Sequence, residues 1–453
     1  MFRRIFVANR GEIAARVIRA CREMGIETVA AHSTADAGSP HLKLATRSVC
    51  IGGARAAESY LNADAILQAA EQTGCQAIHP GYGFLSENAL FAARCASHRL
   101  AFIGPPAAAM RKMGDKIEAR LTMQAAGVPV IPGSKGALAS VEEAALEARG
   151  AGYPVMIKAV AGGGGRGMRR CDDEAALGKF FSEAAAEAEA AFGNPSLYLE
   201  KFIEGGRHIE FQILADQYGA AVHLGERECS VQRHHQKLIE EAPSPVLDAA
   251  TRARLGETAA RAVARIGYTG AGTLEFLRDR DGRLHFMEMN ARLQVEHPVT
   301  EEVTGIDIVK AQIRIAAGEP LGLAQKDVKL TGHALECRLN AEDPSAGFRP
   351  APGRLDAFSI GDPKMDGARL RIETHVESGY TIPPYYDSMI GKVIAWGKDR
   401  PSALDAMAAA LRSSRIEGVP TTVPFHLSVL ADAAFRRGEY DVTLVERLLG
   451  QPA

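Results

Sequence analysis

The first thirty residues alternate between short apolar runs and one amphipathic stretch. Ile5–Ala8 and Thr28–Ala31 are apolar runs of strand length, and apolar residues recur between them at helical spacing before Gly25. This order predicts a βαβ unit. The same alternation continues to about residue 106 and predicts an open α/β domain. The unit has no G-x-G-x-x-G sequence, so a dinucleotide site is not indicated.

The rest of the chain also mixes strands and helices, in regions that begin near residues 129, 207 and 331. Its length of 453 residues corresponds to about three domains of roughly 150 residues each. Strands are predicted at Tyr153–Lys158 and Leu197–Phe202. Helices are predicted at about Asp173–Phe192, Asp307–Ala317, Arg400–Arg412 and His426–Arg436.

Composition excludes several classes of protein. The net charge of −2 argues against a broad nucleic-acid surface, and no apolar run approaches the roughly 18 residues of a membrane helix. The N-terminal apolar stretch is too short for a signal peptide, so we expect no cleaved leader. Seven scattered cysteines without a CxxC pair predict free thiols, a reducing cytoplasmic compartment and no zinc site.

A run of glycines follows the predicted strand that ends at Lys158. The loop Ala161–Met168 contains four consecutive glycines and Arg166. Glycine lets backbone N–H groups approach phosphate oxygens closely, but a Walker A loop places its lysine after the glycines. The loop therefore predicts a mobile flap over nucleotide phosphates, and the alternative is a flexible hairpin tip. Lys158 and Arg166 favour the phosphate interpretation.

Two predicted strands, Thr273–Leu277 and Leu284–Glu288, each contain one glutamate. They are separated by Asp281-Gly282, a pair favoured in two-residue hairpin turns. A turn at this position places Arg278 opposite His285 and Glu275 opposite Glu288. Facing carboxylates repel, and a divalent cation held with nucleotide phosphates would relieve the repulsion. Asn290 falls on the same face as Glu288 because strand side chains alternate. The hairpin therefore predicts a Mg²⁺ site, and the alternative is a solvated hairpin.

Arg292, Gln294 and Glu296 follow at alternate positions. If the segment is extended, the three side chains point the same way. A guanidinium and an amide form a fork for a small planar anion, and a nearby carboxylate could remove its proton. The alternative is a charged sheet edge.

The segment Glu226–Lys237 is dense in hydrogen-bond donors and includes the adjacent residues His234 and His235. No ligand spacing supports zinc. A nucleotide or oxyanion pocket fits this composition, and a polar surface strand is the alternative.

Eight motifs occur in order along almost the whole chain, from about Ile5 to Leu448. They are Ala8–Ala14, His79–Asn88, Met113–Lys116, Gly162–Met168, Gln232–Lys237, Glu288–Pro298, Glu336–Asp343 and Pro383–Met389. In this order they resemble the biotin carboxylases of the ATP-grasp superfamily. The resemblance implies an α/β fold with an N-terminal open domain at 1–112, an ATP-grasp domain at 113–330 and a C-terminal biotin carboxylase domain at 331–449. A glycine-rich lid is expected at about 131–204.

The resemblance also implies an activity. In this family ATP, with Mg²⁺ or Mn²⁺, phosphorylates bicarbonate to carboxyphosphate, which releases CO₂ beside the biotin ring. The implied metal ligands are Glu275, Glu288 and Asn290. The implied ATP contacts are Lys116, Lys158, Gly163, Gly164, Gly165, Glu200, Lys201, Ile203, His208, Gln232, His235, Glu275 and Glu288.

The same resemblance assigns the reacting groups. Glu296 corresponds to the base that deprotonates bicarbonate, and Lys237 to the lysine that steadies the transferring phosphoryl group. Arg338 corresponds to the arginine that stabilises the biotin enolate, and Tyr82 to a second biotin contact. The implied bicarbonate cradle consists of Arg292, Gln294 and Val295. Position 234 is His where many relatives have Arg, which leaves the local charge different but touches none of these roles.

No Ala-Met-Lys-Met-type biotinylation sequence occurs, and the chain is too short to include a carboxyltransferase. We therefore expect biotin on a separate biotin carboxyl carrier protein, a separate carboxyltransferase subunit, and the homodimer common in the family. The expected role is in acetyl-CoA carboxylase and fatty acid biosynthesis. The propionyl-CoA, methylcrotonyl-CoA and pyruvate carboxylases are alternatives.

Two other classes of function are open to an ATP-grasp chain. One is a ligase that joins a carboxylate to an amine, and the other is a non-catalytic ATP-binding subunit. Neither class requires Glu296 and Arg338 in their family contexts, and both residues are present. These two residues therefore favour biotin carboxylation.

Overall fold

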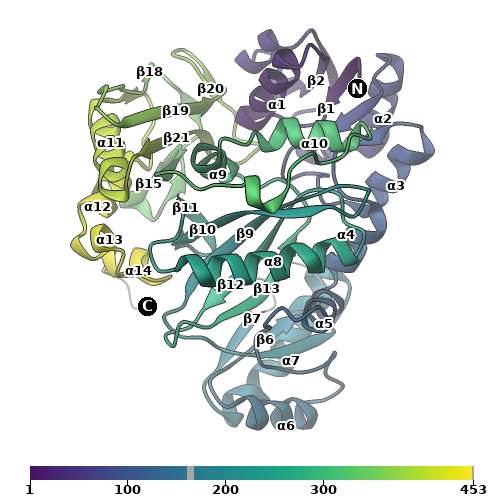
Figure 1. Ribbon diagram of the computed structural model, residues 1–453, viewed down its shortest axis with the longest axis vertical. Helices are drawn as coiled ribbons and strands as arrows, with labels where there is room; N and C mark the ends of the chain where they lie inside the picture. Colours follow the sequence, from purple (N-terminus) through teal and green to yellow (C-terminus); the bar gives the residue numbers. More distant parts are fainter. Residues whose placement is uncertain (161–167, 451–453) are drawn as a thin grey trace.

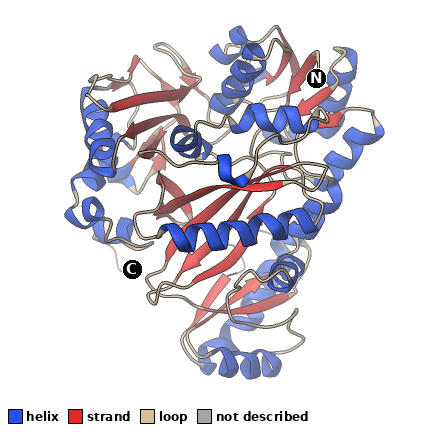
Figure 2. Cartoon of the chain, viewed as in Figure 1, coloured by secondary structure: helices blue, strands red, loops and turns tan. Residues whose placement is uncertain are grey.

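The computed structural model describes residues 1–160 and 168–450 (Figures 1 and 2). The N-terminal part is a parallel sheet in the order β3-β2-β1-β4-β5. Its strands are β1 (Arg4–Val7), β2 (Glu27–Ser33), β3 (Arg47–Gly52), β4 (Ala77–His79) and β5 (Ala101–Phe102). Its helices are α1 (Gly11–Glu23), α2 (Ala63–Gln72), α3 (Ala89–Ser97) and α4 (Ala107–Gly114). The predicted βαβ unit is confirmed as β1–α1–β2.

Both faces of this sheet are buried, as parallel sheets require. One face packs against α1 and α10 (Ile308–Ala316), and the other packs against α2 and α3. Loops follow the carboxyl ends of these strands. One of these loops carries Tyr82 and Glu87, which enter the site described below.

A small three-stranded antiparallel sheet forms a separate lobe at the bottom of Figure 1. It has the order β7-β6-β8, with β6 (Val155–Ala159), β7 (Met168–Cys171) and β8 (Leu197–Lys201). Helices α6 (Val141–Ala151) and α7 (Glu174–Phe192) cover one face with apolar side chains, and α5 (Lys116–Ala125) leads into the lobe. The predicted strands and helix of this region are confirmed. The glycine loop at 161–167, with Gly163, Gly164, Gly165 and Arg166, lies outside the described residues.

The largest sheet has the order β13-β12-β9-β10-β11-β14-β21-β19 and runs without interruption past residue 330. Its first five strands are β9 (Arg207–Ala215), β10 (Ala221–Arg233), β11 (Gln236–Ala242), β12 (Gly270–Arg278) and β13 (Leu284–Asn290). The other three are β14 (His333–Asn340), β19 (Ala368–Thr374) and β21 (Met389–Gly397). All these neighbours pair antiparallel.

The two faces of strand β9 differ in character, one being apolar and the other polar. Ile209, Phe211 and Ile213 point to one face, where α8 (Ala249–Arg265) covers them. Figure 1 shows α8 running across several strands of the sheet. Because side chains alternate, the polar residues of β9 share the opposite face. That face is also buried, so its charged groups must find partners inside the protein.

The C-terminal part packs helices on the far end of the same sheet. They are α11 (Arg400–Ser413), α12 (Val423–Ala431), α13 (Ala433–Arg437) and α14 (Leu444–Leu448). The single helix predicted at His426–Arg436 is wrong, because Asp432 is extended and interrupts it. The Asp432 carboxylate accepts a hydrogen bond from Phe435 N at 2.8 Å and caps α13.

The remaining elements are short. Helix α9 (His297–Thr304) begins directly after Glu296, and α10 packs on α1 and β12. The 3₁₀ turns are η1 (Thr34–Asp36), η2 (Pro40–Leu44), η3 (Ala56–Glu58), η4 (Gln325–Asp327) and η5 (Pro344–Ala346). The small strands are β15 (Glu342–Asp343), β16 (Arg349–Pro350), β17 (Gly353–Arg354), β18 (Ala357–Ser359), β20 (Thr381–Ile382) and β22 (Arg415–Glu417). Across the described ranges, no helix combines the length and apolarity that a bilayer crossing requires.

Candidate active site

The β12–β13 hairpin places Glu275 directly opposite Glu288, as predicted. The predicted pair of Arg278 with His285 is wrong, because Arg278 faces Leu284. The turn is longer than two residues: Asp279 N donates to Arg283 O at 2.9 Å, with Gly282 at φ +86°. A bulge between Glu275 and Phe276 then shifts the register by one residue and restores the acidic pair.

The ammonium of Lys237 is the centre of the site. It lies 2.6 Å from Glu210, 3.0 Å from Glu275 and 2.7 Å from Glu296. Burial alone would lower the pKa of Lys237, but the three carboxylates outweigh burial and raise the pKa well above its ordinary range. Lys237 therefore stays charged and joins β9, β12 and the start of α9 at one point.

Glu296 is fully buried and shared between two cations. Oε1 accepts from Lys237, and Oε2 accepts from Nη2 of Arg338 at 2.9 Å. Burial alone would raise the pKa of Glu296, but Lys237 and Arg338 hold it well below its ordinary range. Arg338 also donates from Nε to Glu240 at 2.6 Å. The site therefore contains a charged carboxylate clamped by two cations on its two oxygens.

Arg292 and Gln294 lie next to this carboxylate and contact one another. Nη1 of Arg292 donates to Oε1 of Gln294 at 2.6 Å, and Gln294 donates to Glu275 at 3.1 Å. The expected extended conformation does not continue to Glu296, whose φ and ψ are −82° and 13° at the start of α9. The turn at Glu296 nevertheless brings its side chain to the same cluster, because Lys237 and Arg338 bind it there.

The small lobe formed by β6, β7 and β8 contributes a second group of charges. Nζ of Lys158 lies 2.5 Å from Glu200, which is buried. Burial lowers the pKa of Lys116, Lys158 adds to this lowering, and Glu288 opposes it. Two lysines therefore stand near Glu288, where polyphosphate oxygens could lie between them.

The other predicted ATP contacts lie on β8, β9 and β10 and in the turns that follow β8 and β10. His208 Nε2 lies 3.3 Å from Glu275, and Gln232 lies 3.4 Å from His208 Nδ1. His235 is exposed at the β10–β11 turn, and Ile203 is half-buried between β8 and β9. The ammonium of Lys201 already donates to the backbone carbonyls of residues 152 and 153, at 2.9 and 2.8 Å.

The acidic pair fits a divalent cation. Glu275 already contacts Lys237, whereas the Glu288 side chain has no hydrogen bond or ion pair to any described residue. Burial raises the pKa of Glu288, and the charge of Glu275 raises it further. A cation bound here would remove that cost, and hard cations prefer carboxylate oxygens. Asn290, the third predicted ligand, is turned toward Arg292, to which its Oδ1 lies at 3.1 Å.

Two further clusters have ligand-like spacing: His208, Glu210 and Glu275, and Glu210, Cys229 and Glu296. The Lys237 ammonium already contacts their three carboxylates, at the point where a metal ion would bind. Burial raises the pKa of the Cys229 thiol well above its ordinary range, which disfavours the thiolate that binds metals. Of the facing pair Glu275 and Glu288, Glu288 is therefore the carboxylate that has no cationic contact among the described residues.

Sequence reasoning missed four residues that support the site. Glu210 binds both Lys237 and the fully buried Arg227, which also contacts Gln212 and Thr300. The signal for Glu210 was its alternation with His208 on one strand. Glu87 and Glu240 have no such signal. Glu87 binds Arg292 at 2.8 Å and Glu240 binds Arg338, and both contacts join distant segments.

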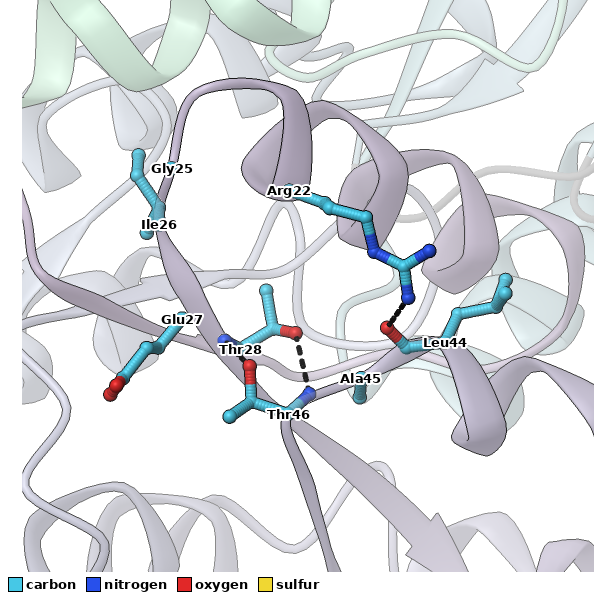
Figure 3. A pocket seen from close by; sticks show the side chains of 8 residues that line it. All are labelled: Arg22, Gly25, Ile26, Glu27, Thr28, Leu44, Ala45 and Thr46. Atoms are coloured by element: carbon cyan, nitrogen blue, oxygen red, sulfur yellow. Dashed lines mark hydrogen bonds between the residues drawn. The ribbon is translucent and has the colours of Figure 1, made fainter.

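Figure 3 shows a surface pocket of about 280 Å³ between the end of α1 and β2. Arg22 donates to Leu44 O at 2.7 Å, and the side chains of Thr28 and Thr46 exchange hydrogen bonds with each other's backbone. None of the predicted site residues lines this pocket. A second cavity, of about 160 Å³, is lined by Tyr82, Glu12 and the loop before β21.

The sequence matches three family models. Residues 1–110 match the biotin carboxylase N-terminal domain, and residues 115–324 match the ATP-binding domain of the carbamoyl-phosphate synthase L chain. Residues 336–447 match the biotin carboxylase C-terminal domain.

Individual relatives are similar over their whole length. Biotin carboxylase of Nostoc sp. is 55% identical over 447 residues, which cover 99% of each chain. The crystal structure of Campylobacter jejuni biotin carboxylase with a β,γ-ATP compound has a TM-score of 0.94 at 49% identity, covering 99% of both chains. The biotin carboxylase domain dimer of Hydrogenobacter thermophilus 2-oxoglutarate carboxylase, solved with MgADP and bicarbonate, has a TM-score of 0.94 at 47% identity, covering 100% and 99% of the chains. The chain therefore belongs to the biotin carboxylase family.

Proposed function

We propose that this chain carboxylates biotin on a separate biotin carboxyl carrier protein, using ATP and bicarbonate, as the first half-reaction of acetyl-CoA carboxylase. The supporting observation is the Glu296 carboxylate held between Lys237 and Arg338, beside the Arg292–Gln294 fork. A protein that only bound ATP would have no use for an anion fork next to a buried base. Biotin carboxylation uses both.

The fork is the proposed site of bicarbonate. The Arg292 guanidinium and the Gln294 amide supply donors for a planar anion, and the backbone at Val295 lies between Gln294 and Glu296. Glu296 then accepts the bicarbonate proton. In the free protein two cations keep the pKa of Glu296 low. An incoming anion that binds Lys237 or Arg338 would weaken the contact of that cation with Glu296, raise the pKa of Glu296 and make it a stronger base.

Phosphoryl transfer to bicarbonate needs neutralisation of negative charge at the transferring group. Lys116 and Lys158 stand on the lid side of the acidic pair, and Lys237 stands between that pair and the fork. Mg²⁺ bound by Glu275 and Glu288 would neutralise and orient the phosphates. Lys237 would exchange its contacts with the carboxylates for a contact with the phosphoryl group, on which negative charge develops during transfer.

The biotin ring is proposed to bind on the other side of Glu296. Arg338 could there donate to the oxygen that becomes negative when the ureido nitrogen loses its proton. Tyr82 lines the cavity of about 160 Å³ formed with the loop before β21. We propose that the tethered ring approaches Arg338 by way of this cavity.

The carboxyltransferase partner and the homodimer are also proposals. The related Hydrogenobacter domain forms a dimer, which supports a homodimer here. Relatives from 2-oxoglutarate and pyruvate carboxylases make those holoenzymes the alternatives to acetyl-CoA carboxylase. The seven cysteines are free thiols, which supports the cytoplasm as the compartment. Identification of the biotinylated protein and carboxyltransferase that co-purify with the chain would decide between the holoenzymes.

Phosphate release from ATP tests the activity directly. With Mg²⁺ and bicarbonate present, we expect free biotin to stimulate release, and we expect no release without bicarbonate. ATP binding without bicarbonate-dependent turnover would overturn the proposal in favour of a non-catalytic subunit. Release stimulated by an amine in place of biotin would favour a carboxylate–amine ligase.

A further inference from the structure

Lys392 is a lysine in the interior of the protein. It lies on β21 directly opposite Arg338 of β14, and none of its surface is exposed. Its ammonium lies 3.1 Å from Oε1 of Glu12 and donates to the backbone oxygen of Val295 at 2.6 Å. Lysine is almost never fully buried without partners, so these two contacts account for its position.

Glu12 extends the same chain of contacts to Tyr82. It lies in the first turn of α1, and its Oε1 accepts from both Lys392 and the Tyr82 hydroxyl. Burial raises the pKa of the Glu12 carboxyl, and the charge of Lys392 opposes that rise. Glu12 and Tyr82 both line the cavity of about 160 Å³. The chain therefore runs from this cavity to the backbone of Val295.

The contacted carbonyl belongs to the turn that carries the reacting groups. Val295 lies between Gln294 and Glu296, and its neighbour Gln294 offers its own backbone oxygen to Nδ1 of His297 at 2.8 Å. Two consecutive carbonyls of the turn are thus held by side chains. The peptide between Val295 and Glu296 joins the backbone of the two residues, so its rotation would displace the Glu296 carboxylate and the neighbouring Gln294 side chain.

We propose that Lys392 and Glu12 are positioning residues of the bicarbonate cradle, with Lys392 holding the Val295 carbonyl and Glu12 holding Lys392 against Tyr82. This inference rests on the proposed function, in which Arg292, Gln294 and Val295 hold bicarbonate. Lys392 itself touches no substrate. It sets the geometry of the two groups that do, from a strand that is distant in the sequence.

The simplest alternative is that Lys392 only balances the charge of Glu12. The double variant Glu12→Gln/Lys392→Met separates the two roles, because it removes both charges together. If charge balance is the only role of Lys392, this double variant should have the wild-type KM for bicarbonate. Positioning predicts that the KM for bicarbonate rises by about tenfold or more while the KM for ATP changes by less than about twofold, since small displacements of a reacting group are costly.

A second variant covers the case in which the double variant does not fold. Lys392→Arg keeps the charge, but its planar guanidinium cannot place a single donor where the ammonium lies. We expect a raised KM for bicarbonate and an unchanged KM for ATP. Arg400→Met is the matched control, because Arg400 forms a buried ion pair with Glu241 outside the site, at 2.6 Å. It should lower the melting temperature without changing either KM.

The steady-state phosphate-release assay reads out all variants. A wild-type KM for bicarbonate in the folded double variant or in Lys392→Arg would overturn the inference. Equal increases in the KM values for bicarbonate and ATP would also overturn it, since a general loss of structure would produce them. Absence of bicarbonate-dependent turnover in the wild type would instead contradict the proposed function, so the two failures are distinguishable.

Discussion

Oε2 of Glu296 lies 2.9 Å from Nη2 of Arg338. Glu296 directly precedes α9, whereas Arg338 lies on β14, 42 positions later in the chain. The proposed base for bicarbonate and the proposed stabiliser of the biotin enolate are therefore in direct contact before any substrate binds. We propose that this contact couples proton removal at one substrate to the charge that develops at the other.

Replacement of Glu296 by Gln should separate binding from chemistry. We expect Glu296→Gln to bind Mg-ATP with nearly wild-type affinity and to lose bicarbonate-dependent turnover by at least about 10²-fold, the usual contribution of a positioned base. Calorimetry measures the affinity, and phosphate release measures the turnover. Glu257→Gln, at an exposed position on α8, is the control and should behave as wild type. Lost ATP binding in folded Glu296→Gln would contradict the assigned role.

Replacement of Glu288 by Gln should change the response to metal. Without metal, the variant should be more stable by about 0.2–1 kcal/mol, because it removes the like charge opposite Glu275. With Mg-ATP, the variant should gain less thermal stability than the wild type. Thermal denaturation with and without Mg-ATP measures both effects, and Asp281→Asn at the exposed hairpin tip is the control. Equal stabilisation of variant and wild type would place the metal elsewhere.

We expect Glu336 to make the stability of the protein depend on pH. Both of its carboxylate oxygens are buried without a hydrogen-bond partner among the described residues. Burial raises its pKa well above the ordinary value of 4.5, and Glu240 on the neighbouring strand raises it further, while Lys392 and Arg338 oppose the rise. A raised folded pKa favours the protonated form. The stability from this group is therefore complete below the ordinary pKa and is lost as pH rises toward the raised value.

Replacement of Glu336 by Gln should remove that loss, because the amide is neutral at every pH. We expect the free energy of unfolding of Glu336→Gln, minus that of the wild type, to increase between pH 5 and pH 8 by at most about 1.4 kcal/mol per pH unit. Urea denaturation at several pH values measures this difference. A difference that does not vary with pH would mean that Glu336 is charged throughout, against the direction of its pKa shift.

Arg227 should be one of the most sensitive positions for stability. It is fully buried and binds Glu210 at 2.6 Å, with further bonds to Gln212, Thr273 and Thr300. Arg227→Met leaves Glu210 with less compensation, and breaking a buried pair costs about 3–5 kcal/mol. We expect a lower melting temperature and partial recovery in Arg227→Met/Glu210→Gln. A single variant as stable as the wild type would show that Lys237 alone suffices for Glu210.

Local patterns predicted much of the fold. The β1–α1–β2 unit followed from apolar spacing, and the facing of Glu275 and Glu288 followed from the alternation of strands on either side of a glycine turn. The details of that hairpin did not follow. The turn is longer than Asp281-Gly282, and a bulge near Glu275 compensates for the shift, because bulges depend on packing around the strand rather than on the turn residues.

The sequence by itself determined which residue types are available and which face of a strand each side chain takes, since side-chain direction alternates with every residue. Alternation predicted the grouping of Arg292, Gln294 and Glu296, but a turn at Glu296, not an extended strand, brings the third side chain to the other two. Only the tertiary structure decided that Lys237 and Arg338 meet at Glu296, and that Lys392 reaches Val295. Those contacts depend on the order β12-β9-β10-β11-β14-β21 across the sheet. Alternation along one strand carries no information about which strand will lie beside it, because that order is set by packing of the whole core.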